Sequence, residues 1–408
     1  MAQNTASPTP TPTSASAMAT PRTRAGLLTA VAVLLIALNL RLGMSSAAAL
    51  LDALRADLGF SPLVAALLPT LPSLCFAAAG AGTGAPARRL GAERTVLAAV
   101  AALTAGLAVR AVPATWALLA GTVLGMSGLA LCNVLLPTLV RTHFPGRVGL
   151  LTGLCTTALA LGATLASAVA VPVAGAVGSP SLGLAVWALP ALVATAVWAA
   201  RTGVRTRTPD VAVAPEERIS PWAMARTRLG ALVTAYFGLQ ALNAYAITGW
   251  LPSLLSGHGM SEGAAGVVLA VAQAVGIPVS FAVLALAKGP AGLRGAFAAV
   301  SAAMLAGFAG LLVAPMALPL VWAVLVGLGL CSFPLVLTVI AQSGSGPAQT
   351  TALSTLAQSL GYLLAASGPL AVGLLRDATG GWTAPMALLL ATAAAQMAAG
   401  IALTRRRP

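Results

Sequence analysis

The chain has 408 residues, of which 59% are hydrophobic and 7% are charged, and its mean hydropathy is +0.94. This balance excludes a soluble globular protein, which needs more polar surface to face water, and it predicts a chain mostly covered by lipid. The formal net charge of +14 does not indicate a nucleic-acid partner, because the basic residues lie in short connectors and form no contiguous basic domain.

The N-terminal segment 1–24 is rich in Pro, Ser, Thr and Ala and has no apolar core. It predicts a disordered cytoplasmic tail instead of a signal peptide or a helix. Twelve apolar segments follow, each long enough to cross about 30 Å of hydrocarbon as a helix. They lie at about 25–53, 62–81, 95–111, 116–140, 149–173, 182–200, 229–252, 262–287, 295–314, 318–341, 350–375 and 382–404. The pattern lacks the short alternating segments of a transmembrane barrel, so it predicts an all-α membrane protein with twelve transmembrane helices.

One long polar interval separates the sixth and seventh segments. We therefore expect an N-terminal six-helix bundle at 25–201, a cytoplasmic linker at 202–228, a C-terminal six-helix bundle at 229–404 and a basic cytoplasmic tail at 405–408. If the N-terminus is cytoplasmic, the inner side holds all 22 basic residues except Arg41, Arg55, Arg110 and Arg376. This bias predicts that both termini and the linker lie in the cytoplasm, with Arg55, Arg110 and Arg376 on the outer side.

The two halves also repeat each other. The tetrapeptide ALNL at 37–40 recurs as ALNA at 241–244, and a shift of 199 residues pairs Cys132 with Cys331, Thr152 with Thr351 and Gly162 with Gly361. Such parallel repeats are typical of secondary transporters.

Two six-helix bundles that have the same orientation in the membrane resemble the major facilitator superfamily. Four segments further resemble the CynX/NimT family of cyanate and 2-nitroimidazole transporters: NLRLGMSSAAALLDALRADLG at 39–59, LCNVLLPTLVRTHFPGRVGLLTGL at 131–154, AITGWLP at 246–252 and AQSLGYLLAASGPLAVGLLRDATGGW at 357–382. The resemblance implies a carrier of the cytoplasmic membrane whose solute passes between the halves near the bilayer midplane. The superfamily motif after the second span is present only in part at 84–94, because Arg88 occupies its usual acidic position.

Arg41 is the main candidate site residue. It lies about sixteen residues into the first span, roughly 24 Å along the helix. An arginine at the centre of a span costs about 2.5–3.5 kcal/mol to insert, so such residues usually face the bundle interior and mark a site. Arg41, Ser45, Ala48 and Asp52 follow helical spacing and predict one small, polar stripe, with Leu40 and Leu51 pointing elsewhere. Asp52 is the competing partner for Arg41, and a structural, snorkelling arginine is the other alternative.

Further polar residues lie inside the apolar segments. We expect Asn39, Gln240, Asn243 and Gln358 to contact the solute, because their spans resemble cavity-lining spans of the superfamily. Tyr362 shares a helix face with Ser354 and Gln358 and joins them as a candidate. For Asn133, solute binding and a helix–helix hydrogen bond remain equally open, since amides in membrane helices often bond neighbouring helices.

The sequence thus predicts a carrier that moves a small polar or anionic solute by alternating access, with Arg41 as its anchor. A multidrug-type efflux carrier of small amphipathic compounds is the alternative. We expect no enzymatic activity, cofactor or metal, because no cluster of paired acids, nucleophile and base, or metal ligands lies inside the spans. No Asp or Glu lies in the middle of a span, so coupling is expected not to use a membrane-centre carboxylate. A monomer is expected.

Overall fold

The computed structural model describes residues 21–82, 84–203, 220–343 and 346–405, and these residues form helices and short connections without strands. The predicted tail 1–24 lies outside the described residues except for its last four, which belong to the first helix. Of the predicted linker, 204–219 lie outside, as do 406–408 of the predicted basic tail.

The helices of the first part of the chain are α1 (Pro21–Ala49), α2 (Leu51–Leu58), α3 (Pro62–Gly82), α4 (Gly84–Leu90), α5 (Ala92–Val109), α6 (Thr115–His143), the 3-10 turn η1 (Pro145–Arg147), α7 (Val148–Val177), α8 (Pro180–Ala185) and α9 (Ala188–Gly203). Those of the second part are α10 (Pro221–Ala225), α11 (Arg228–Ser256), α12 (Glu262–Leu286), α13 (Gly289–Val313), α14 (Pro319–Leu330), α15 (Ser332–Ser343), α16 (Pro347–Thr379) and α17 (Thr383–Thr404).

The predicted all-α membrane fold is confirmed. Eleven helical segments in the described part of the chain are long and apolar enough to cross a membrane. α11 is not among them, although it has 29 residues, the same length as α6. With α11 counted, the twelve predicted spans each have a helical counterpart.

Three predicted spans are interrupted. In the predicted span 25–53, helix α1 ends before Leu50, whose φ of −105° and ψ of 9° are not helical, and the span continues as α2. Ser46 donates a hydrogen bond to the Leu42 carbonyl oxygen at 2.8 Å, a bond of the kind that often bends helices. The sixth span is divided into α8 and α9, and the tenth into α14 and α15 at Cys331.

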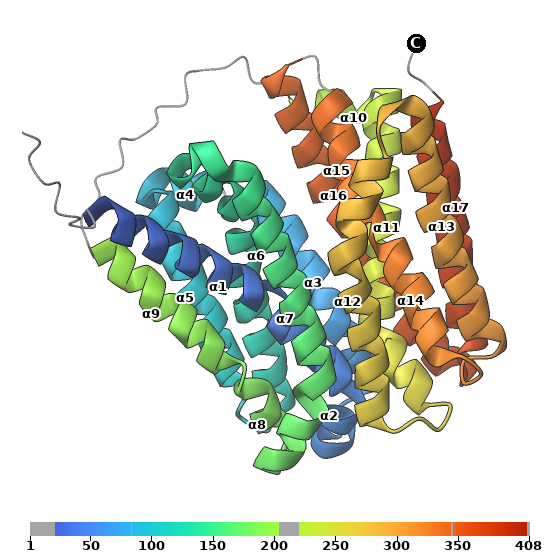
Figure 1. Cartoon of the computed structure of the whole chain (residues 1–408). Coiled ribbons are helices and arrows are strands. Elements are labelled where there is room, and N and C mark those ends of the chain that lie inside the picture. Colours follow the sequence, from blue (N-terminus) through green and yellow to red (C-terminus); the bar gives the residue numbers. More distant parts are fainter. Residues whose placement is uncertain (1–20, 83, 204–219, 344–345, 406–408) are drawn as a thin grey trace, which may run out of the picture.

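Figure 1 shows α1 to α9 on one side of the molecule and α11 to α17 on the other. We call the end where α9 ends and α10 begins the linker end, and the opposite end, which holds α2 and α8, the distal end. The two sides pack together in part through buried residues near the distal end, among them Leu54 of α2, Ala66 of α3 and Leu251 of α11.

Three glycines bring backbones into close contact across the two sides. A Cβ at Gly249 of α11 would lie 2.6 Å from the Pro69 Cβ of α3, and one at Gly373 of α16 would lie 2.5 Å from the Ala66 Cβ. A Cβ at Gly266 of α12 would lie 2.6 Å from the Ser167 carbonyl oxygen of α7. Because Gly249 and Gly266 lie in the distal parts of their helices, the two sides are tightly closed toward the distal end.

Candidate functional site

Arg41 lies where α1 meets the other side of the molecule. Its guanidinium carbon is 5.7 Å from the centroid of the Tyr245 ring of α11, a distance at which a cation is attracted to the face of an aromatic ring. The side chain is partly exposed. The only ion pairs among the described residues involve Glu93, so no carboxylate in that part of the chain neutralises Arg41 at contact distance.

Four aromatic rings form a cluster beside Arg41, which we call the aromatic cluster: Phe76, Phe237, Tyr245 and Tyr362. Tyr362 of α16 lies at its centre, with ring centroids 5.1 Å from Phe76 of α3, 5.2 Å from Phe237 and 6.2 Å from Tyr245. These distances fall in the range that aromatic pairs prefer. The cluster therefore joins three helices, α3, α11 and α16, across the two sides.

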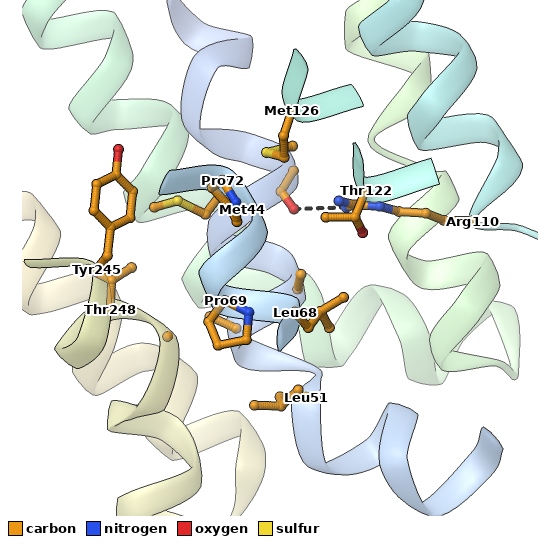
Figure 2. A pocket seen from close by; sticks show the side chains of 14 residues that line it. Met44, Leu51, Leu68, Pro69, Pro72, Arg110, Thr122, Met126, Tyr245 and Thr248 are labelled. Carbon is orange, nitrogen blue, oxygen red and sulfur yellow. Dashed lines mark hydrogen bonds between the residues drawn. The ribbon is translucent and has the colours of Figure 1, made fainter. Parts of the chain in front are cut away.

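A cavity lies between the two sides near the aromatic cluster, and we call it the distal cavity. Its lining includes Gly43, Pro69, Arg110, Thr122, Tyr245 and Thr248. Figure 2 shows Tyr245 and Thr248 on one side of it and Arg110 with Thr122 on the other. Its volume is about 20 Å³, which holds about one water molecule. Arg41 does not line this cavity, but Tyr245 borders it and also contacts Arg41.

Arg110, which the sequence placed on the outer side at the end of the segment 95–111, is buried. Only 1% of it is exposed, and its Nη1 donates a hydrogen bond to the Gly43 carbonyl oxygen at 2.9 Å. The side chain fits because Gly121 of α6 has no Cβ; one there would lie 3.0 Å from the Arg110 Cγ. Arg41 is thus not the only arginine among the helices. The signal that sequence reasoning missed is the run of glycines at 121, 125 and 128 facing α5.

Arg201, which the sequence counted among the basic residues of the inner side, is a second buried arginine. It ends the N-terminal part at the linker end and is 6% exposed. Its Nη2 is 2.7 Å from Glu93 Oε1 and 2.8 Å from His143 Nε2, and its Nε donates to the Thr29 hydroxyl at 2.8 Å. These contacts join α1, α5, α6 and α9, so the group holds that bundle together at its linker end.

Asn39 and Asn243, which occupy equivalent repeat positions, belong to two separate hydrogen-bond networks. Asn39 is fully buried, and its Nδ2 donates to the carbonyl oxygens of Leu35 at 2.8 Å and Pro190 at 3.2 Å. Asn243 is also fully buried; its Nδ2 donates to Gln396 Oε1 at 3.0 Å, and its Oδ1 accepts a hydrogen bond from Thr392 at 2.7 Å. Both amides bond helices of their own half.

The other predicted site residues are dispersed. Gln358 is partly exposed and donates to the Ser354 hydroxyl of its own helix at 2.9 Å. Gln240 is 3% exposed, and Asn133 is partly exposed. Tyr362 lies in the aromatic cluster, so it is the predicted residue that the structure brings beside Arg41. The role of each in binding a solute stays a prediction.

The predicted polar stripe on the first span is corrected in two respects. Asp52 lies beyond the break at Leu50, on α2, and so not on the helix that carries Arg41. Leu51, expected to point elsewhere, lines the distal cavity with Ala48. The break in the helix changes the direction of every side chain after it, and for this reason the stripe does not continue.

Comparisons with known proteins agree with this architecture. The family model described as Major Facilitator Superfamily matches residues 31–369. The chain is 34% identical over 378 residues to "Uncharacterized transporter YycB" of Bacillus subtilis (strain 168), which covers 92% of this chain and 93% of that protein. It is 34% identical over 356 residues to "2-nitroimidazole transporter" of Escherichia coli (strain K12), covering 87% and 89% of the two chains.

A third relative is "Cyanate transport protein CynX" of Escherichia coli (strain K12), 28% identical over 357 residues that cover 86% of this chain and 91% of that protein. Among solved structures, the crystal structure of the nucleoside transporter NupG matches with a TM-score of 0.76, covering 92% of this chain and 99% of that one. Its sequence is 12% identical, so this likeness shows the fold alone.

Proposed function

Because the chain belongs to the Major Facilitator Superfamily and is a multi-pass secondary transporter, not an enzyme, we propose that it moves a small polar or anionic solute with Arg41 as the anchor. The solute is cyanate-like or nitroimidazole-like, and it crosses the cytoplasmic membrane by alternating access. Relatives named for 2-nitroimidazole and cyanate transport support this class of solute.

The observation that carries the proposal is the position of Arg41. It is a permanent cation between the two sides of the molecule, it contacts Tyr245 across them, and among the described residues it has no carboxylate partner. A planar guanidinium with five N–H donors matches a carboxylate, a nitro group or a small anion. The solute then supplies the negative charge or dipole that neutralises Arg41, which the described part of the protein does not provide.

The aromatic cluster supports a planar solute. Tyr362 and Phe76 have ring centroids 5.1 Å apart with an interplanar angle of 30°, and Tyr245 presents its ring to Arg41. A flat heteroaromatic or linear triatomic molecule placed beside Arg41 can contact these rings while its polar end bonds to the guanidinium.

The orientation is part of the proposal. Arg88, Arg89 and Arg141 are exposed and lie near the linker end of their helices, which is the distribution that places an end of a membrane protein in the cytoplasm. Both termini and the linker are then cytoplasmic, and the tightly packed distal end faces outward.

A thermal-stability screen of the purified protein tests the anchor. The solutes are cyanate, nitrate, 2-nitroimidazole and small carboxylates, and the variants are Arg41→Ala and the exposed control Arg141→Ala. A ligand at about 100 times its Kd stabilises the folded state by about 2.7 kcal/mol, which is measurable as a rise in Tm. We expect the rise in the wild type and in Arg141→Ala and its loss in Arg41→Ala. A rise that persists undiminished in Arg41→Ala rules out the anchor.

A further inference from the structure

Within the described part of the chain, the charged guanidinium of Arg110 is buried without a counter-charge and without a full set of hydrogen bonds. It is 1% exposed, its Nη1 bonds to the Gly43 carbonyl oxygen, and its Nε has no hydrogen-bond partner. A guanidinium has five N–H donors and does not deprotonate in a protein. A buried ion that is neither paired nor fully hydrogen-bonded is costly, so such an ion usually has a counter-charge.

The protein itself does not provide this counter-charge within the described ranges. Neither of the two ion pairs found there includes Arg110. The Thr122 hydroxyl, which lines the same cavity, already donates its proton to the Leu118 carbonyl oxygen at 2.6 Å. Much of the remaining lining is apolar, including Met44, Leu68 and Met126. One carbonyl dipole from Gly43 is therefore the polar partner that the structure gives to Arg110.

The guanidinium reaches the distal cavity. Figure 2 shows the Arg110 side chain extending past Thr122 to the backbone of α1, with its end group toward the residues that line the cavity. The cavity volume of about 20 Å³ admits a particle of about the size of a water molecule. A halide ion or the end of a linear triatomic anion has this size, whereas a heteroaromatic ring requires the two sides to separate.

We infer that the distal cavity is a binding site for one small monovalent anion, a halide or a pseudohalide, held by the guanidinium of Arg110. The site is separate from the solute anchor at Arg41 and does not depend on what Arg41 binds. The anion replaces the missing counter-charge and accepts hydrogen bonds from donors of Arg110 that the protein leaves free.

Because the cavity lies between the two sides of the molecule, a bound anion affects the conformational equilibrium of the protein. Gly43 and Arg110 belong to one side of the molecule, and Tyr245 and Thr248 belong to the other. A cavity formed by both sides exists only when they are closed at this level. An anion bound in it stabilises the closed distal end, because a ligand shifts a conformational equilibrium toward the state that binds it better.

Thermal unfolding of the purified full-length protein in detergent tests the site. The probes are chloride and bromide, titrated at constant ionic strength against gluconate, which is too large for the cavity. The variants are Arg110→Gln, which removes the charge, Arg110→Lys, which keeps it, Arg41→Ala and the exposed control Arg141→Ala.

We expect Tm to rise with the small anions in the wild type, in Arg41→Ala and in Arg141→Ala. In Arg110→Gln the apparent Kd rises at least about tenfold, and Arg110→Lys retains part of the affinity. No anion-dependent rise in the wild type, or an undiminished rise in Arg110→Gln, overturns the inference.

A second measurement covers the case in which Arg110→Gln fails to fold. Crystals of the wild type grown or soaked in bromide are measured at the bromine absorption edge. An anomalous peak in contact with the Arg110 guanidinium supports the site, and its absence from the distal cavity overturns it. Failure of the Arg41 proposal leaves both results unchanged, so the two proposals fail independently.

Discussion

The guanidinium carbon of Arg41 on α1 lies 5.7 Å from the centroid of the Tyr245 ring on α11, so a cation of one half is held by an aromatic face of the other. The same tyrosine borders the distal cavity that contains Arg110. Tyr245 therefore contacts the proposed anchor and also borders the inferred anion site.

We predict that a replacement of Tyr245 weakens solute binding when it removes the aromatic ring and has little effect when it keeps the ring. A cation–π contact is worth about 0.5–2 kcal/mol, so Tyr245→Leu should release Arg41 and raise the apparent Kd for 2-nitroimidazole or nitrate by about 2- to 30-fold. Tyr245→Phe keeps the ring face and should stay within about threefold of the wild type. Isothermal titration with both probes measures the difference, and equal losses in the two variants would show that the hydroxyl matters instead of the ring.

Asn243 provides a test of whether its amide binds the solute or holds α11 to α17. Its Nδ2 and its Oδ1 both bond to side chains of α17, so Asn243→Leu should lower the stability of the fold by about 1–3 kcal/mol, because it removes the donor to Gln396 Oε1 and the acceptor of the Thr392 hydroxyl. Solute affinity should change little in the folded fraction. A variant of normal Tm that no longer binds the solute would instead establish Asn243 as a binding residue.

Hydropathy alone predicts the class of the fold, because each apolar segment is long enough to cross the membrane whatever it contacts. It does not predict the break at Leu50, since an average over about twenty residues is insensitive to one non-helical residue. For the same reason the expected stripe from Arg41 to Asp52 ends early.

A local sequence pattern also does not predict which residue a side chain bonds to, or whether an arginine at the end of a span is buried. Asn243 bonds Gln396, 153 residues away in the chain, and only the packed structure reveals that the amide is already occupied. Arg110 was expected only to lie on the outer side, because it is near the outer end of the apolar segment 95–111. Its burial depends on the space beside Gly121, a property of two helices together.

Closure of the distal end should depend on the glycine of α12 that contacts α7. A Cβ at Gly266 would lie 2.6 Å from the Ser167 carbonyl oxygen, so Gly266→Ala should separate the two sides locally at a cost of about 1–3 kcal/mol. Gly263→Ala is the matched control on the same helix, because no atom lies within 4 Å of its added Cβ. Thermal unfolding should show a lower Tm for Gly266→Ala and an equal or higher Tm for Gly263→Ala.

The same pair of variants reports on conformation. A cysteine placed near the distal end, in a background from which the four native cysteines are removed, should react faster with a membrane-impermeant thiol reagent in Gly266→Ala than in Gly263→Ala. Equal reaction rates and equal Tm values would contradict the view that this contact closes the distal end.

The pair of Arg201 with Glu93 should be a strong determinant of stability at the linker end. Glu93→Gln removes the carboxylate that lies 2.7 Å from Arg201 Nη2 and leaves a cation that is 6% exposed. Removing one partner of a buried ion pair costs about 3–5 kcal/mol, whereas replacing both partners with apolar groups is often nearly neutral. We therefore expect a large fall in Tm for Glu93→Gln and a recovery in the double variant Glu93→Gln with Arg201→Met.

Arg94, an exposed neighbour on α5, provides the control, and Arg94→Gln should leave Tm unchanged. If Tm does not recover in the double variant, the charges do not act as a pair, and the bundle is held at this end by packing, including that of the fully buried Trp198 ring, whose centroid lies 4.6 Å from the Arg201 guanidinium carbon.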